Sequence, residues 1–372
     1  MKSGTSEPTK VAIIGGGVAA LEAMLALNAI GYAKADVHLF SPQTRFVLKP
    51  LAVSSGFGRG GLINFDLQKL AATGGATFHE SSVSEVDASR RVLTLSDDSE
   101  FEYDFLIASP GAALVEAVPG AMTYIWQSGK EAVTEAMATL RDRKESRVVV
   151  TMPEGGSWPM PLYELALLIA DELGSGASIS IVTPEKSPLD LFGNEATGKV
   201  TALLQDRNIE TVLETAPAEY RDGALVTVDG QQIEADIAIA LPLLDGRRVQ
   251  GLPSDEQGFI PVDGFGRIHD HEREFAAGDA TSFPVKFGGL ATEQADIVAG
   301  AIAAAAWGAT APEPFKPVFR GTLVTADGMI GLGPGADSSG PYAWDPAEKV
   351  HGKFLTPFLK AADPATLGSE EQ

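Results

Sequence analysis

Three consecutive glycines at positions 15 to 17 constrain the fold of this chain more than any other feature. They follow residues 10–14 (KVAII), a short apolar run with a β-branched majority that is typical of a buried parallel strand. Residues 18–30 are rich in Ala and Leu and favour a helix, and residues 36–40 (DVHLF) predict a second strand. A strand, a glycine turn, a helix and a strand within about 30 residues predict a βαβ unit.

The glycine turn also has the pattern of a dinucleotide-binding loop. Gly15, Gly17 and Ala20 match G-x-G-x-x-[GA], in which the first glycine makes the turn and the second lets the backbone approach a pyrophosphate. The small third residue lets the helix pack on the strand, and the helix N-terminus favours phosphate. Ser41 stands after the second strand, where an acid usually binds the ribose, and it offers a hydroxyl without charge. We therefore expect a dinucleotide site here rather than an empty structural turn.

Charge and composition exclude several classes of function. Lys and Arg number 28 against 50 Asp and Glu, so the net charge of −22 repels nucleic acid and disfavours an anionic bilayer. The chain has no cysteine, which excludes disulfides, thiolate metal sites and cysteine redox relays. The polar N-terminus lacks the apolar core of a secretory signal, and residues 297–307 are too short to span a bilayer. These features predict a cytoplasmic protein that binds no nucleic acid, and they disfavour membrane contact.

A second βαβ unit is predicted in the middle of the chain. Residues 147–182 have the pattern strand, helix, strand, a loose repeat of the first unit. Further strands are expected at 105–108 and 237–241, and helices at 131–143, 194–206 and 289–307. We predict an α/β protein with two Rossmann-like (FAD/NAD(P)-binding) domains and a smaller C-terminal segment. The expected limits are 1–115 with 255–310 for the first domain, 116–254 for the second, and 311–372 for the C-terminal segment.

Several motifs after the first unit resemble those of the two-dinucleotide-domain flavoproteins, in the same order. Residues 275–279 (FAAGD) resemble the strand and Gly-Asp pair that contact FAD, which implies this role for Gly278 and Asp279. Residues 103–112 (YDFLIASPGA) resemble the middle motif, with Ser109 and Gly111 at its end in place of the usual Thr-Gly. The strand that passes the adenine is similar to residues 82–87, with Val83 at the contact. The resemblance implies FAD as the cofactor.

The nearest branch resembles the sulfide:quinone oxidoreductases and type II NADH dehydrogenases. Residues 46–51 (FVLKPL) are similar to the segment that passes the flavin there, which implies that Lys49, Pro50 and Lys286 lie near the ring. Gly289 follows Lys286 closely and is assigned to the same site. A lysine beside the flavin stabilises the negative charge of the reduced ring. The alternative for Lys286 is a surface lysine.

The second unit lacks the nicotinamide fingerprint. Residues 163–166 (YELA) resemble the family's Val-Glu-Leu-Ala, an alignment that puts Ser157, Pro159 and Leu162 where three glycines are expected. Larger side chains there obstruct the approach to a pyrophosphate. Thr183 stands where a second ribose-binding acid is expected. We therefore do not expect NAD(P)H in the usual pose.

The resemblance singles out one carboxylate for catalysis. Glu164 matches a glutamate that lies near the flavin and the acceptor in type II dehydrogenases, where burial would raise its pKa and let it move a proton. The alternative is a surface glutamate in a first helical turn. Trp158 either packs over the flavin or a ring-shaped substrate, or fills the domain interface. No metal site is expected, although His269 and His271 flank Asp270 in a charged loop.

These observations predict an FAD-dependent oxidoreductase. Sulfide and disulfide chemistry need the absent cysteines, so electrons would pass through the flavin from a small-molecule donor to a quinone or similar small acceptor. The alternative is an FAD-containing electron-transfer subunit that needs a protein redox partner, and a flavin-free structural relative is a third option. Residues 344–359 are expected to pack on the body or on the second subunit of a homodimer, with weak membrane contact as the alternative.

Overall fold

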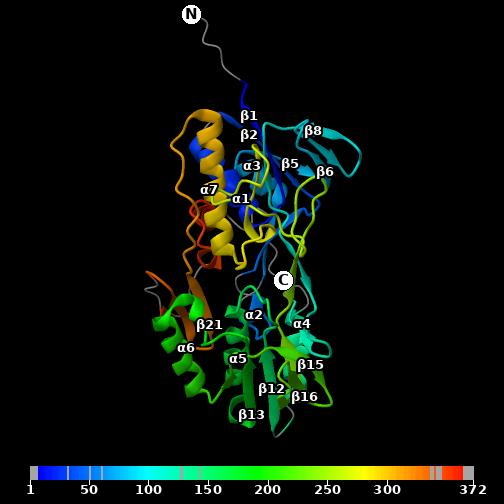
Figure 1. Cartoon of the computed structure of the whole chain (residues 1–372). Helices are drawn as coiled ribbons and strands as arrows, with labels where there is room; N and C mark the ends of the chain where they lie inside the picture. Colours follow the sequence, from blue (N-terminus) through cyan, green and yellow to red (C-terminus); the bar gives the residue numbers. More distant parts are fainter. Residues whose placement is uncertain are drawn as a thin grey trace, which may run out of the picture.

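Two separate five-stranded parallel sheets organise the computed structural model, one above the other in Figure 1. The structure describes residues 7–31, 33–49, 52–59, 62–125, 129–141, 143, 145–335, 339–340 and 346–362. None of the helices in these ranges is long and apolar enough to cross a membrane.

The first sheet has the strand order β20-β9-β1-β2-β5. Its N-terminal part is the predicted βαβ unit, β1 (Thr9–Ile14), α1 (Val18–Gly31) and β2 (Ala35–Ser41), with β1 and β2 parallel and in direct register. The other strands are β5 (Ala76–Glu80), β9 (Phe105–Ala108) and β20 (Glu274–Ala276). Strand β20 lies far downstream of the others in the sequence, and its place in the sheet brings the end of the FAAGD motif (residues 275–279) to the glycine turn.

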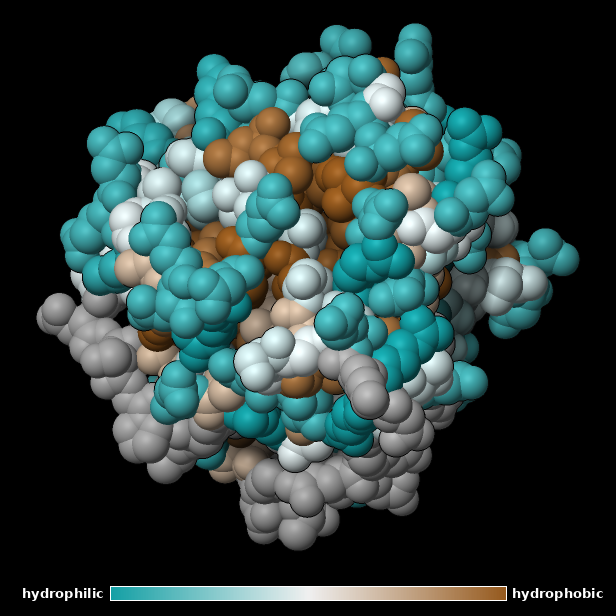
Figure 2. All heavy atoms as spheres, turned by 90° about the horizontal axis from the view of Figure 1, so that it is seen from below, coloured by the Kyte–Doolittle hydropathy of each residue, from teal (hydrophilic) through white to brown (hydrophobic). Residues whose placement is uncertain are grey.

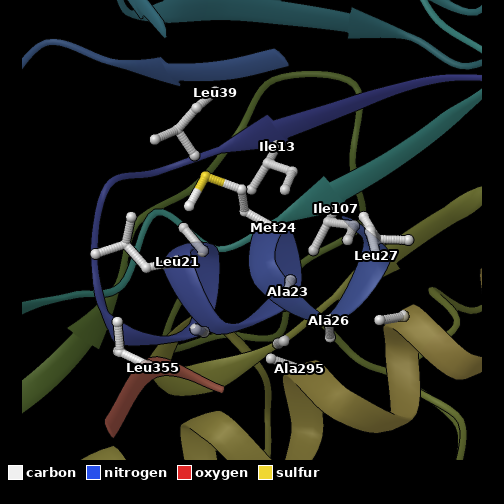
Figure 3. Packing of buried hydrophobic residues seen from close by; sticks show 14 of the residues in the cluster. Ile13, Leu21, Ala23, Met24, Ala26, Leu27, Leu39, Ile107, Ala295 and Leu355 are labelled. Atoms are coloured by element: carbon white, nitrogen blue, oxygen red, sulfur yellow. The ribbon is translucent and has the colours of Figure 1, made fainter. Parts of the chain in front are cut away.

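Helix α7 (Gly288–Trp307) packs closely along α1 because small residues line the contact. Figure 3 shows Ala26 of α1 directed at Ala295 of α7, while Met24 points to the sheet, towards Ile13 and Leu39. A glycine at the end of a helix often forms a left-handed C-cap, but Gly31 does not have a positive φ. It is the last residue of α1, and a Cβ there would lie 2.4 Å from the ring of Trp307.

The second sheet has the order β11-β18-β12-β13-β14 and repeats the crossover of the first. Strand β12 (Ser146–Thr151) leads through α5 (Met160–Leu173) to β13 (Ala177–Val182), and α6 (Asn194–Asp206) leads to β14 (Glu210–Val212). Strands β11 (Met122–Thr123) and β18 (Ile237–Ala240) complete it, next to α4 (Gly129–Arg141). The second predicted βαβ unit is confirmed, with bounds within a residue or two of the expected ones.

The C-terminal segment forms regular structure and contacts both halves of the molecule, the half built on the first sheet and the half built on the second. Strands β21 (Gly321–Thr325), β22 (Gly328–Leu332) and β23 (Ser339–Gly340) form an antiparallel sheet against α5. The 3-10 helix η4 (Pro346–Val350) and α8 (Leu355–Ala361) then pack on α7 and α1. Trp344 lies outside the described residues.

The remaining elements are short helices and the strands of four smaller sheets, β3-β4, β6-β7-β8, β10-β19 and β15-β16-β17. They are β3 (Arg45–Leu48), α2 (Ala52–Ser55), β4 (Ile63–Asp66), α3 (Leu67–Thr73), β6 (Val83–Asp87), β7 (Val92–Leu95), β8 (Glu100–Glu102), β10 (Ala112–Val115), η1 (Gly174–Gly176), η2 (Asp190–Phe192), β15 (Pro217–Arg221), β16 (Ala224–Thr227), β17 (Gln232–Glu234), β19 (Leu243–Gly246) and η3 (Gly278–Ala280).

Apolar surface remains visible at the end of the molecule formed by the second sheet. Figure 2 looks at this end and shows apolar side chains gathered in a hollow between polar ones. A groove of about 260 Å³ lies between α4 and the strands β11 and β18, lined by Met122, Ala136, Leu140 and Ile237 among others. It borders the amino end of β18, where an ion pair joins Arg143 and Asp236.

Candidate functional site

The turn after β1 is built around Gly15 and Ser109. Gly15 has φ 122°, and a Cβ there would fall 2.1 Å from the backbone oxygen of Ser109, so only glycine fits. The backbone N–H and the Oγ of Ser109 both donate to the carbonyl of Ile14, at 2.8 and 3.0 Å. Ser109, at the end of β9, therefore supports the glycine turn from the neighbouring strand.

Open space lies beside two of the predicted cofactor glycines. A Cβ on Gly17 or on Gly111 would meet no atom within 4 Å, and Gly111 has φ 72°. The first turn of α1 carries no acidic side chain, so its positive end favours an anion. Ala20 is fully buried and lets α1 lie close to the sheet. We call the space bordered by Gly17, Gly111 and the N-terminus of α1 the cradle. It fits the pyrophosphate of a dinucleotide.

The Gly278-Asp279 motif lies against the start of α1. Gly278 has φ 76°, and a Cβ there would lie 2.9 Å from the Cβ of Ala19. Its N–H donates to Oε1 of Gln294 on α7 at 2.7 Å, which holds the turn between the two helices. The structure therefore brings together two motifs that are far apart in the sequence, and both border the same cradle.

A carboxylate and two lysines lie at one side of this cradle. Burial raises the pKa of Asp279, while the charges of Lys286 and Lys49 lower it. Lys286 is buried, its Nζ donates to the carbonyl of Thr281, and it lies 4.0 Å from the ring centroid of Phe259. Burial lowers the pKa of Lys286 to about 8, against the opposing charge of Asp279. Lys286 is therefore not the surface lysine of the alternative interpretation.

The other predicted cofactor residues have more local roles in the structure. Ser41 is fully buried, and its Oγ accepts the N–H of Gln43 at 3.1 Å beneath the glycine turn. Val83 begins β6 and is half-buried. Gly289 is a buried residue of the first turn of α7, where a Cβ would lie 2.8 Å from the ring of Phe287. Pro50 lies outside the described residues.

Glu164 is buried where α5 meets the C-terminal segment. Only 2% of its surface is exposed, and its Oε1 accepts from Lys349 Nζ at 2.6 Å and from the N–H of Val324 at 2.9 Å. Burial raises the pKa of Glu164, and Lys349 opposes the rise. This placement contradicts the surface alternative. Lys349 was missed in the sequence because nothing local marks it as a partner 185 residues away.

The loop before α5 is in contact with the cradle. Trp158 stacks on Phe287, with ring centroids 4.0 Å apart and planes at 15°, and the N–H of Lys286 donates to the carbonyl of Ser157 at 3.4 Å. Trp158 therefore packs between the loop before α5 and the loop before α7, beside the cradle. Phe287 precedes α7, so the loop lies beside the N-terminus of that helix.

Side chains of the second unit hydrogen-bond across the region where a nucleotide would approach. The hydroxyl of Tyr163 donates to Glu185 Oε2 at 2.7 Å, and Thr183 donates to the same oxygen at 3.0 Å. Burial raises the pKa of Glu185 to about 7. These residues join the first turn of α5 to the end of β13, the crevice that binds nucleotides in such sheets.

No metal-binding cluster is found in the described ranges. His271, one of the two histidines in the charged loop, has its Nδ1 at 3.4 Å from Glu274. The pair in that loop therefore shows no ligand arrangement.

The fold and the cradle define a two-dinucleotide-domain flavoprotein. The model of the pyridine nucleotide-disulphide oxidoreductase family matches residues 9–305, and the chain belongs to this family. It is an FAD-dependent oxidoreductase, and the residues around the cradle fit that cofactor, with open space at two glycines, a helix N-terminus without acidic side chains and an aspartate that interacts with two lysines.

Solved structures share this fold at low sequence identity. The sulfide:quinone oxidoreductase of Aquifex aeolicus superposes with a TM-score of 0.77 at 18% identity, over 88% of this chain and 85% of the other. NDH2 of Plasmodium falciparum, solved with NADH, gives 0.68 at 13% identity, over 95% and 93%. A chain of the Tetrahymena thermophila mitochondrial ATP synthase gives 0.69 at 13% identity, over 97% and 98%.

Proposed function

We propose that the FAD of this enzyme takes electrons from a small-molecule donor and passes them to a quinone or a similar small acceptor. The observation that carries this proposal is the buried Glu164. It lies on the helix whose preceding loop contacts Lys286 and Phe287 beside the cofactor cradle. A carboxyl group with a raised pKa at such a place suits proton delivery to a ring that gains electrons. The related quinone oxidoreductase from Aquifex agrees with this choice of acceptor.

We assign different residues of the cradle to different parts of the cofactor. The N-terminus of α1 and the backbone of Gly17 hold the pyrophosphate, and Asp279 accepts hydrogen bonds from the ribityl chain. Lys286 and the N-terminus of α7 stabilise negative charge on the ring. Bound FAD supplies the electron-transfer chemistry. Ser41, Lys49, Val83, Ser109, Gly111 and Gly289 complete the proposed site.

We propose that a nicotinamide cofactor in the usual pose is not the donor. Tyr163 and Thr183 both donate to Glu185 at the crevice of the second unit, and Trp158 stacks on Phe287 beside the cradle. A bound nucleotide would have to displace these contacts, at a cost in free energy.

Reductant and acceptor assays test the proposal. The purified protein should carry FAD, keep its visible absorbance when mixed anaerobically with NADH or NADPH, and reduce short-chain quinones once the flavin is reduced chemically. Rapid bleaching by NADH would contradict the choice of donor. If the reduced flavin is reoxidised no faster with quinones than with buffer alone, the choice of acceptor is wrong.

A second candidate is an FAD-containing electron-transfer subunit that works with a protein redox partner. It is supported by the related chain of the Tetrahymena ATP synthase, which belongs to a large assembly and matches almost end to end. Purified protein that holds FAD yet is inert with every quinone and dye, and that gains turnover with a protein partner, would favour this candidate.

A further inference from the structure

Tyr124 is a buried tyrosine whose hydroxyl has no hydrogen-bond partner in the described part of the chain. Only 6% of its surface is exposed. The other three tyrosines in the described ranges all use their hydroxyls, since Tyr103 donates to Glu274 at 2.9 Å, Tyr163 to Glu185 at 2.7 Å and Tyr220 to the carbonyl of Ala235 at 3.0 Å. Leaving a buried donor unpaired costs stability, and such groups in native proteins call for an explanation.

Tyr124 lies at the junction of the two halves. It follows β11, and its N–H donates to the carbonyl of Ala240 at the carboxyl end of β18, the edge of a parallel sheet where ligands bind. It belongs to the same hydrophobic cluster as Val53 of α2, the helix that follows the FVLK segment, and as Trp158, which stacks beside the cradle. Tyr124 therefore lies at the carboxyl edge of the second sheet, in the same cluster as Trp158, which borders the cofactor cradle.

The charge of one carboxyl group, that of Glu164, influences the phenol of Tyr124 in these apolar surroundings. Burial raises the pKa of the Tyr124 phenol, and the charge of Glu164 raises it further, so the hydroxyl stays protonated and has a hydrogen to donate to a ligand. Both hydrogen bonds that Glu164 accepts from described residues end on Oε1, and Oε2 takes part in neither. Apolar walls with a few fixed polar groups are typical of sites for small ring-shaped ligands.

We infer that the hydroxyl of Tyr124 is a binding group for the electron acceptor, donating a hydrogen bond to a carbonyl oxygen of a quinone at the junction of the two halves. This inference rests on the proposed function, because it assigns a residue to the acceptor site of that reaction. A quinone supplies the neutral oxygen acceptor that the phenol lacks, and the side chains that pack around Tyr124 are apolar, as a quinone ring requires.

The substitution Tyr124→Phe tests this inference, because it removes the hydroxyl without removing any hydrogen bond within the described protein. The variant should keep its full FAD content and flavin spectrum, with a melting temperature equal to or above that of the wild type. Its dissociation constant for a short-chain benzoquinone, measured by titrating the absorbance of the oxidised flavin without any donor, should rise about tenfold.

The matched control is Tyr103→Phe, which removes a buried hydroxyl that does have a partner, Glu274, in the first sheet. This control should lower the melting temperature and leave quinone binding unchanged. Equal quinone affinity in Tyr124→Phe and wild type would overturn the inference alone. Weaker FAD binding in Tyr124→Phe with unchanged quinone affinity would also overturn it, since the hydroxyl would then serve the flavin. Wild-type protein that neither binds nor reduces the quinone would overturn both this inference and the proposed acceptor.

Discussion

Glu22 of α1 and Asp296 of α7 share a hydrogen bond across the contact between these two helices. Glu22 is fully buried and accepts the N–H groups of Phe354 and Leu355, at 2.8 and 2.6 Å, at the start of α8. Further charge comes from Glu293 on α7 and from Lys353 in the C-terminal segment. The carboxyl pair therefore anchors α8 to the first sheet's helices.

This anchor should weaken as the pH rises. Burial, followed by the charge of Glu22, raises the pKa of Asp296 from 3.8 to about 7, so the folded state binds the proton more tightly than the unfolded chain does. The stabilisation is complete below about pH 4 and is lost as the pH rises through about 7, a difference of about 2 kcal/mol after allowance for partial exposure. Asp296→Asn should remove this slope from the free energy of unfolding. Hydrogen exchange of α8 at pH 5.5 and pH 8 measures it locally, and equal slopes in both proteins would contradict the prediction.

Glu164→Gln should separate the structural from the chemical role of this residue. The amide keeps an acceptor for the N–H of Val324 and loses the charge that pairs with Lys349, so the free energy of unfolding should fall by about 2 kcal/mol. Turnover with a quinone should fall at least about 100-fold if the carboxyl delivers a proton. Lys349→Met is the matched variant, since it breaks the same ion pair and keeps the carboxyl. Equal losses of kcat in the two variants would show that turnover depends on the Glu164–Lys349 ion pair and not on proton delivery by the carboxyl group.

Lys286→Met should make the flavin harder to reduce. The substitution removes a buried positive charge beside Asp279 while FAD stays bound, and the midpoint potential should fall by about 30 mV, equivalent to about 1.4 kcal/mol. Because the pKa of Lys286 is lowered to about 8, the difference from wild type should shrink above that pH. Spectroelectrochemical titration between pH 6.5 and pH 9 measures both effects. Lys199→Met, on the exposed face of α6, is the control, and a similar shift there would rule out a local origin.

Three glycine variants should respond differently to one added methyl group. Gly17→Ala meets no protein atom, so the apo fold should survive while FAD affinity falls more than about tenfold. Gly15→Ala meets the Ser109 carbonyl at 2.1 Å with φ at 122° and should not give a stable cradle. Gly198→Ala, inside α6 with open space, should be stabilising by about 0.4 to 1 kcal/mol with FAD affinity unchanged. Thermal melts and FAD titrations distinguish the three variants. Unchanged FAD affinity in Gly17→Ala would contradict the proposal that FAD binds in the cradle.

Local patterns were sufficient to predict the framework of the protein. The apolar run before Gly15 and the alanine-rich run after Gly17 encode a strand and a helix through their own periodicity, and the glycines encode the turn through its backbone angles. The structure has the predicted elements within a residue or two. The close contact between Gly31 and Trp307 could not be predicted in this way, because Trp307 lies 276 positions further along the chain.

The sequence by itself therefore determined the α/β class, the two crossover units, the family and the identity of the cofactor. Only the tertiary structure decided which partners the polar side chains meet. Lys349 reaches Glu164 across 185 residues, Glu22 caps an N–H 332 residues away, and the hydroxyl of Tyr124 has no hydrogen-bond partner among the residues that the structure describes. Turns and periodic faces are encoded by neighbouring residues, whereas these contacts depend on how the sheets and the C-terminal segment pack. A lone Glu or Tyr in the sequence carries no mark of that packing.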